Sequence, residues 1–140
     1  MGILLNKQTN ISENFPLKIL VVDDSSTMRR ILKNNLANLG YKDVLEACDG
    51  LEAQAVLNKN NDVSLALIDW NMPVMNGLDL LHDIKKSTAL KHIEVIMVAT
   101  ESEKQNIVKA IKAGAANYII KPFSPEIIPE KIKSVMGIKP

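Results

Sequence analysis

The chain has 140 residues, of which 46% are hydrophobic and 24% are charged, a composition that suits one globular domain with a complete core. Its 17 lysines and arginines nearly balance its 16 acidic residues, so the net charge of +1 gives no overall attraction to nucleic acid or to a membrane surface. Cys48 is the only cysteine, which excludes an internal disulfide and a multi-cysteine zinc site. No apolar run is long enough for a membrane span, and we expect a cytoplasmic protein.

Residues 1–16 are expected to form a flexible N-terminal leader, because residues 6–16 are polar, lack periodicity and end on a proline. A single domain is expected over residues 17–137. Within it, short apolar runs alternate with amphipathic stretches. The expected strands are Lys18–Val22, Val44–Ala47, Leu65–Ile68, Val95–Ala99 and Tyr118–Ile120.

A helical pattern follows each of these strands. The first helix has Ser25 or Ser26 as its N-cap and Gly40 as its stop signal. The residues expected on its apolar face are Met28, Ile31, Leu32, Leu36 and Leu39. The later helices are indicated by Leu51 and Ala55, by Leu81 and Ile84, by Ile107, Ala110 and Ile111 before Gly114, and by Ile128, Ile132 and Val135 after a Ser124-Pro125-Glu126 start.

Continuously apolar strands that alternate with helices predict a parallel sheet covered on both faces. The expected fold is therefore a doubly wound α/β domain with five parallel strands and five helices, a flavodoxin-like three-layer sandwich. In such sheets functional groups gather beyond the carboxyl ends of the strands. The residues at these ends are Asp23 and Asp24, Cys48 and Asp49, Asp69, Ala99 and Thr100, and Lys121.

The three carboxylates of Asp23, Asp24 and Asp69 would repel one another if they met at this edge, by about 4 kcal/mol for two charges 4 Å apart at an effective dielectric near 20. A cation is therefore expected among them. Magnesium fits better than zinc, because the ligands are oxygens and no sulfur or paired histidine is near. Lys121 would supply a second positive charge.

A carboxylate held beside magnesium and an ammonium group can attack a phosphorus centre, because both cations neutralise the phosphoryl oxygens in the transition state. Asp69 would then become an acyl phosphate. Each residue alone also has an ordinary interpretation: Asp23 and Asp24 as first-turn acids of a helix, Lys121 as a surface lysine, and Asp69 as the start of a turn. Their placement at successive strand ends favours a shared site.

Four motifs occur in order along the chain: VVDD at the first strand end, DWNMP around Asp69, NG shortly after it, and YIIKPF at the fifth strand. With these motifs, the chain from Lys18 to Met136 resembles the receiver domain of two-component response regulators. Within that family, DDSSTMRR together with DWNMP and KPF is most similar to the stand-alone chemotaxis regulators.

The resemblance implies that Asp69 accepts a phosphoryl group from a histidine kinase and that Lys121 contacts the phosphoryl oxygens. It also implies that Mg²⁺ is bound by Asp24, Asp69 and the main-chain carbonyl of Asn71, with Asp23 acting partly through water. Such a protein is not an enzyme in the usual sense, because it assists only its own phosphorylation and dephosphorylation.

Two further expectations follow from the same resemblance, and a third follows from the sequence itself. Tyr118 matches an aromatic residue that turns inward on activation, although it could also be an ordinary half-exposed strand tyrosine. The Lys121-Pro122 bond is expected to be cis. Trp70 is the only tryptophan and adjoins Asp69, so its fluorescence should report binding at the site.

The end of the fourth strand departs from the family pattern, which has Ser or Thr followed by a small residue where this chain has Ala99 followed by Thr100. Successive strand residues point to opposite faces, so Thr100 cannot replace a hydroxyl at position 99 without a bulge. We expect phosphorylation to survive and its coupling to Tyr118 to weaken; a local bulge that restores the Thr100 hydroxyl is the alternative.

No further domain is expected after Met136, so the signal would leave through the surface of the fourth helix, fifth strand and fifth helix. Lysines on these helices could meet an acidic partner or simply form a solvated face. They are Lys104, Lys109, Lys112, Lys131 and Lys133. The expected partners of a monomeric protein are a chemotaxis histidine kinase and a flagellar motor switch protein, with a phosphatase as a further candidate.

Other functions remain open from the sequence. A phosphate sink would drain the kinase without binding the motor, and a receiver could also serve another two-component pathway. A magnesium-dependent phosphohydrolase with an aspartyl nucleophile would carry that nucleophile after the first strand and a second acid two residues later, where this chain has Ser25.

Overall fold

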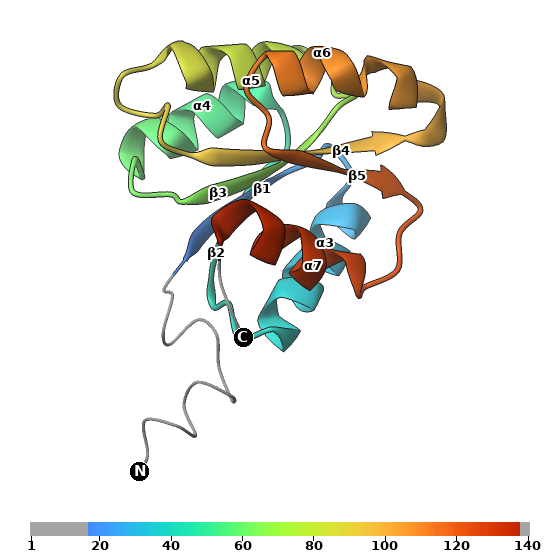
Figure 1. Cartoon of the computed structure of the whole chain (residues 1–140). Coiled ribbons are helices and arrows are strands. Elements are labelled where there is room, and N and C mark those ends of the chain that lie inside the picture. Colours follow the sequence, from blue (N-terminus) through green and yellow to red (C-terminus); the bar gives the residue numbers. More distant parts are fainter. Residues whose placement is uncertain (1–16, 138–140) are drawn as a thin grey trace.

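The computed structural model describes residues 17–137, so the expected leader over residues 1–16 lies outside the described part of the chain. Five parallel strands form one sheet in the order β2-β1-β3-β4-β5 (Figure 1). The strands are β1 (Lys18–Val22), β2 (Asp43–Ala47), β3 (Leu65–Asp69), β4 (Glu94–Thr100) and β5 (Asn117–Lys121). The expected strands are confirmed to within one residue at each end.

Helices cover both faces of the sheet. Figure 1 shows α3 and α7 on one face and α4, α5 and α6 on the other. The helices are α3 (Ser26–Asn38), α4 (Gly50–Lys59), α5 (Gly77–Lys86), α6 (Ile107–Lys112) and α7 (Ile127–Met136), and a 3₁₀ helix, η1 (Glu101–Asn106), leads into α6. The predicted doubly wound, flavodoxin-like α/β fold is confirmed.

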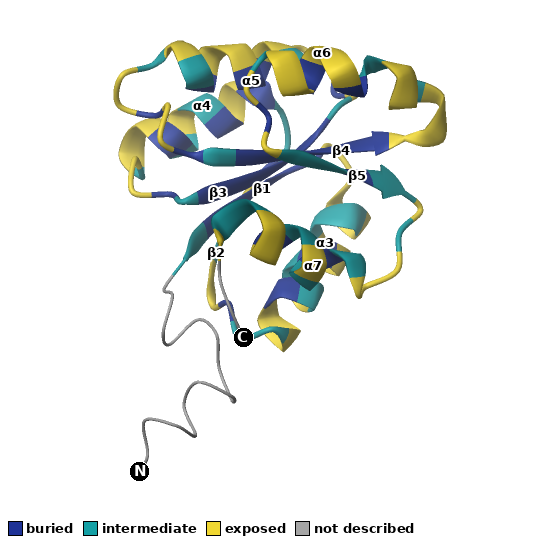
Figure 2. Cartoon of the chain, viewed as in Figure 1, coloured by how far each residue is buried: buried dark blue, intermediate teal, exposed yellow. Residues whose placement is uncertain are grey.

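The centre of the sheet is the most deeply buried part of the molecule (Figure 2). All five residues of β3 are buried, including Asp69 at its end. Two apolar clusters lie on either side, one with residues of α3 and α7 and the other with residues of α4, α5 and α6. Strand β3 can therefore hold a polar group at its carboxyl end in a rigid position.

The ends of α3 agree with the signals in its sequence. Ser25 is the N-cap, and its hydroxyl oxygen accepts a hydrogen bond of 3.1 Å from the Met28 N–H. Gly40 follows the helix with φ +95°, a backbone conformation that glycine adopts without the steric cost of a Cβ. Leu32 and Leu36 are buried, whereas Ile31 is 42% exposed, so the expected apolar face is narrower than predicted.

The predicted buried face of α4 is wrong. Leu51 is 53% exposed and Ala55 is also exposed, whereas Ala53 and Leu57 are fully buried. Two residues advance a helix by roughly 200°, so a stripe that begins at Ala53 turns Leu51 toward solvent. The sequence contains apolar residues on both sides of this short helix, and packing against β2 and α5 selects one of them.

Two further expectations near the C-terminus need correction. Ile111 of α6 is 45% exposed, although Ile107 and Ala110 of the same helix are buried as expected. Helix α7 begins at Ile127 and not at Pro125, and no side chain caps it. The Ile127 and Ile128 N–H groups donate to the Ser124 and Pro125 carbonyls, so residues 124–128 form turns that lead into the helix. Within residues 17–137, none of the helices has both the length and the apolar character that a membrane crossing requires.

Candidate functional site

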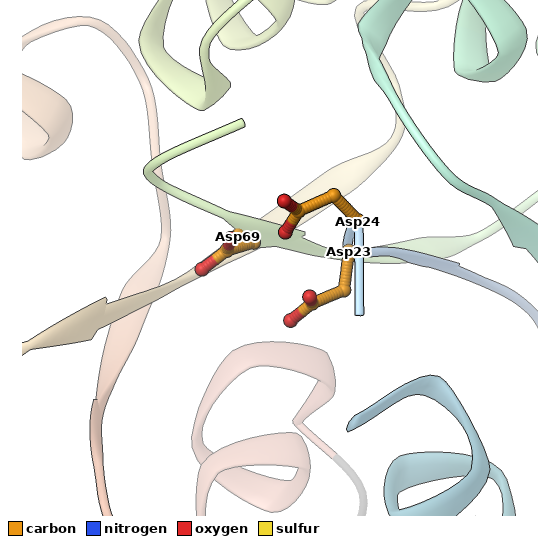
Figure 3. Close-up of side chains that lie close together, drawn as sticks. All are labelled: Asp23, Asp24 and Asp69. Carbon is orange, nitrogen blue, oxygen red and sulfur yellow. The ribbon is translucent and has the colours of Figure 1, made fainter. Parts of the chain in front are cut away.

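Three carboxylates meet at the carboxyl edge of the sheet. Asp23 and Asp24 directly follow β1, and Asp69 is the last residue of β3. These two strands pair in parallel with Val22 opposite Ile68, so their ends lie side by side. One carboxylate oxygen of each acid lies within 4.8 Å of the others. Figure 3 shows the three side chains gathered at the ends of the two strands. Asp23 and Asp69 are only 1% and 5% exposed, whereas Asp24 faces solvent.

Lys121 reaches this cluster from the end of β5. Its Nζ lies 2.9 Å from Asp69 Oδ1 and 3.4 Å from Asp23 Oδ2. Asp23 is held further by the Ser25 N–H, which donates to its Oδ1 at 2.9 Å. The structure thus brings together the four charged side chains that the sequence placed at successive strand ends.

The charges of the cluster do not balance. The pKa of Asp69 is raised to about 6, first by burial and then by the charges of Asp23 and Asp24, against the lowering effect of Lys121. Burial alone would lower the pKa of Lys121, but its hydrogen bond to Asp69 and the charges of Asp69 and Asp23 outweigh this effect and raise it. One ammonium group therefore neutralises the three acids incompletely, and a further cation would be stabilised here.

The donor set fits a magnesium ion. It consists of hard carboxylate oxygens from two strand ends, with Asp24 open to solvent so that bound waters can complete the coordination. No histidine or cysteine belongs to this group among the described residues. Asn71 lies exposed in the loop after Asp69, and within residues 17–137 no hydrogen bond joins its side chain to the acids.

The loop after Asp69 is fixed by main-chain contacts. The Trp70 N–H donates to the Val98 carbonyl of β4 at 2.8 Å, and the Trp70 carbonyl accepts from the Gly77 N–H at 2.9 Å. Gly77 packs so closely that a Cβ there would collide with the Asp69 carbonyl oxygen. Asn76 caps α5 through its side chain. The Asn-Gly pair therefore starts a helix and also lets that helix approach Asp69.

The end of β4 offers no polar side chain to the cluster. Ala99 is fully buried, and Thr100 is exposed. The Thr100 hydroxyl lies 3.0 Å from the Ser102 hydroxyl, and its N–H donates to the Glu103 carboxylate at 2.8 Å. Pairing of β4 with β5 continues without interruption to the Thr100–Lys121 pair. The bulge that would have turned Thr100 inward is absent from this pairing, so that alternative is wrong.

Tyr118 and Pro122 lie beside the lysine of the site. Tyr118, in β5, is half-buried, and the Lys131 ammonium lies 4.7 Å from the centre of its ring. The Lys121-Pro122 bond is cis, as the family resemblance implied. A groove of about 300 Å³ runs between β5 and α7, and its lining includes Tyr118, Phe123 and Lys131.

Sequence reasoning missed one contact of the site. Arg29 of α3 donates a hydrogen bond of 2.7 Å from Nη1 to the main-chain carbonyl of Asp23. Arg29 and Arg30 are neighbours in the sequence. The sequence pattern does not show which of the two contacts the end of β1 and which is exposed to solvent. Only the tertiary path of α3 distinguishes the two arginines.

The architecture and the acidic edge define a class: a doubly wound α/β domain with a cation site at the ends of β1 and β3 and a lysine delivered by β5. Residues 19–133 match the response regulator receiver domain, and the chain belongs to that family. It is thus a signalling module of two-component systems.

The individual relatives are chemotaxis proteins. The chain is 52% identical over 121 residues to chemotaxis protein CheY1 of Helicobacter pylori, which covers 86% of this chain and 98% of that protein. It is 51% identical to the CheY homolog of Campylobacter jejuni, over 86% and 93% of the two chains. Among solved structures, Vibrio cholerae CheY4 is 31% identical and superposes with a TM-score of 0.78 over 85% of this chain and 98% of that one.

Proposed function

We propose that this protein is a stand-alone chemotaxis response regulator whose Asp69 accepts a phosphoryl group from a histidine kinase in a Mg²⁺-dependent step. The observation that carries the proposal is the position of the Asp69 carboxylate: it closes a fully buried strand, faces two other acids and lies 2.9 Å from the Lys121 ammonium. The similarity to CheY proteins over most of the chain supports the chemotaxis assignment.

The transfer would use groups already in place. A carboxylate oxygen of Asp69 attacks phosphorus, a bond between that oxygen and phosphorus forms, and the phosphorus–nitrogen bond of the donor phosphohistidine breaks. Asp69 must be ionised to attack. Its pKa is raised to about 6 in the metal-free site, and a bound cation would lower this pKa and so favour the attacking carboxylate. Lys121 holds the phosphoryl oxygens by charge. A bound Mg²⁺, held by Asp23, Asp24, Asp69 and the Asn71 carbonyl, would neutralise further negative charge.

The output surface would comprise η1, α6, β5 and α7. Its lysines face solvent on α6, where Val108 is 60% exposed and Ile111 is 45% exposed. A surface that combines exposed aliphatic groups with Lys109 and Lys112 suits an acidic, partly apolar segment. We infer that this segment belongs to the flagellar motor switch, that a phosphatase is a further partner, and that the protein acts as a cytoplasmic monomer.

A phosphate sink is the second candidate, and one observation favours it. Neither Ala99 nor Thr100 presents a hydroxyl to Asp69 at the end of β4, so a phosphoryl group there would lack a partner on that strand. A receiver of another two-component pathway would carry the same site. A phosphohydrolase is less well supported, because Ser25 stands where its second acid is needed.

The test of phosphoryl uptake is incubation with Mg²⁺ and a small acyl-phosphate donor, followed by intact mass. The wild type should gain one phosphoryl group, and Asp69→Asn should gain none. Asp43→Asn is the matched control, because Asp43 is an exposed acid at the start of β2. An unmodified wild type, with no change in Trp70 fluorescence on adding beryllium fluoride, would overturn the proposal.

Binding of a motor-switch peptide then separates the two candidates. A regulator should bind the peptide more tightly after phosphorylation. A sink should become phosphorylated with the same kinetics and show no change in peptide affinity. Steady turnover of small phosphomonoesters would instead indicate a hydrolase.

A further inference from the structure

The main chain is hydrogen-bonded on both sides of the Asp23 Cα atom. The Asp23 N–H donates to the Ala47 carbonyl of β2 at 3.1 Å. The Asp23 carbonyl accepts the 2.7 Å hydrogen bond from Arg29 Nη1. This carbonyl belongs to the peptide that carries the Asp24 N–H, so its orientation decides where the Asp24 side chain begins.

Arg29 is itself anchored. Its Nε donates to Glu46 Oε1 at 3.0 Å, and the other carboxylate oxygen of Glu46 is 2.9 Å from Lys33 Nζ. The Arg29 side chain is only 17% exposed. One planar guanidinium group thus spans from Glu46 on β2 to the main chain at the end of β1, a geometry that its rigid, forked donors allow and that a single ammonium group cannot reproduce.

We propose that Arg29, anchored by Glu46, is a positioning residue. It fixes the orientation of the Asp23–Asp24 peptide group so that the acid cluster can bind a cation. Arg29 touches neither carboxylate of the pair, and Asp24 has no hydrogen bond among the described residues that would fix it in another way. This inference rests on the proposed Mg²⁺-dependent function of the same site.

The sign of the effect distinguishes positioning from simple electrostatics. Arg29 is a positive charge close to a site for cations, so removing its charge alone should strengthen Mg²⁺ binding. Loss of a group that orients metal ligands should weaken it, typically by about 10- to 100-fold. A role confined to joining α3 to β2 would change thermal stability and leave Mg²⁺ affinity unchanged.

The experiment is a calorimetric titration of the metal-free full-length protein with Mg²⁺ at 15 °C. We expect Arg29→Gln to weaken binding at least about tenfold. Arg29→Lys should weaken it as well, because lysine keeps the charge and loses one of the two contacts. The matched controls are Arg30→Gln, an exposed neighbour on the same helix, and Lys33→Gln, which also contacts Glu46; both should remain within about twofold of wild type.

A double-mutant cycle adds a second readout. Glu46→Gln should weaken Mg²⁺ binding in the wild-type background and have no effect in the Arg29→Gln background, because Glu46 acts through Arg29. Thermal unfolding without metal shows that each variant is folded at the titration temperature, and Arg29→Lys decides alone if Arg29→Gln is not folded. Unchanged or tighter binding by the folded Arg29 variants overturns the inference, whereas a wild type that binds no Mg²⁺ overturns the proposed function itself.

Discussion

Strands β3 and β4 are neighbours in the sheet and end side by side, yet their ends carry opposite chemistry. β3 ends in Asp69, a buried carboxylate beside an ammonium group and two other acids. β4 ends in Ala99, which has no polar side-chain atom, and in Thr100, whose hydroxyl meets Ser102. The groups that would take up a phosphoryl group, at the end of β3, are therefore in place. The end of β4, which would detect that group, offers it no hydrogen-bond donor from a side chain. We therefore propose that phosphoryl uptake and the response to it can be separated in this chain.

The largest expected effect concerns the end of β3, where Lys121 contacts Asp69. Replacing Lys121 by Met removes the only ammonium group that contacts Asp69 among the described residues. Phosphorylation by a small acyl-phosphate donor should slow by at least about 100-fold, the usual cost of losing one group that stabilises transition-state charge. Intact mass measured over time gives the rate.

Lys112→Met serves as the control for this experiment, because Lys112 is an exposed lysine of α6 outside the site. It should be phosphorylated at the wild-type rate. The variant Lys121→Met should at the same time bind Mg²⁺ more tightly, since it loses a competing cation from between the acids. Equal rates for the two variants would mean that Lys121 does not act on the phosphoryl group.

The second effect is the pH dependence of stability that Asp69 causes. Its pKa rises from an ordinary 3.8 to about 6 on folding, so the folded state binds the proton more strongly than the unfolded state. Stability is therefore lost as the pH rises from about 4 to above 6. In metal-free protein at pH 7.5, Asp69→Asn should raise the free energy of unfolding by on the order of 2–3 kcal/mol.

Urea unfolding at several pH values measures this difference. The advantage of Asp69→Asn should shrink as the pH falls through 6 and should vanish below about 4, where Asp69 is protonated in both states. Asp43→Asn again provides the control, because Asp43 is exposed. A constant difference between Asp69→Asn and wild type across this range would show that the carboxylate is not destabilised by burial.

The third effect concerns the end of β4, where Ala99 has no side-chain hydroxyl. Ala99→Thr places a hydroxyl on the strand next to Asp69, and a hydrogen bond to a charged group contributes roughly 1.5–3 kcal/mol. The phosphorylated variant should bind a motor-switch peptide about tenfold more tightly than phosphorylated wild type. Fluorescence titration of the peptide measures it, and Ala99→Val controls for added bulk at this fully buried position. Unchanged affinity would show that Ala99 does not limit the response.

The sequence predicts the chemistry at the end of β3 better than the contacts around it. Five apolar runs identify the strands because a parallel sheet buries both faces of each strand, and acids at the ends of parallel strands must share an edge. The pleat also predicts that Thr100 faces away from Asp69, although only the uninterrupted pairing of β4 with β5 excludes a bulge.

Other features depend on tertiary packing and have no local signal. The buried side of α4 was mispredicted because apolar residues occur on both sides of a ten-residue helix. The hydrogen bond from Arg29 to Asp23 depends on how α3 crosses β1, and Arg30 beside it has the same chemistry in sequence. The close approach of Gly77 to Asp69 likewise needs the path of the loop between them.

The smallest expected effect concerns Thr100, whose hydroxyl contacts the Ser102 hydroxyl in the first turn of η1. Thr100→Ala removes a contact between two exposed hydroxyl groups and should lower the free energy of unfolding by no more than about 0.5 kcal/mol, as is usual for a surface substitution. The rate of phosphoryl uptake should not change, because the hydroxyl points away from Asp69. Ser102→Ala removes the other partner of the same contact and should cost no more than Thr100→Ala. Slower uptake in Thr100→Ala alone would mean that the hydroxyl reaches the phosphoryl group after all, and β4 would then resemble β3 in carrying part of the chemistry.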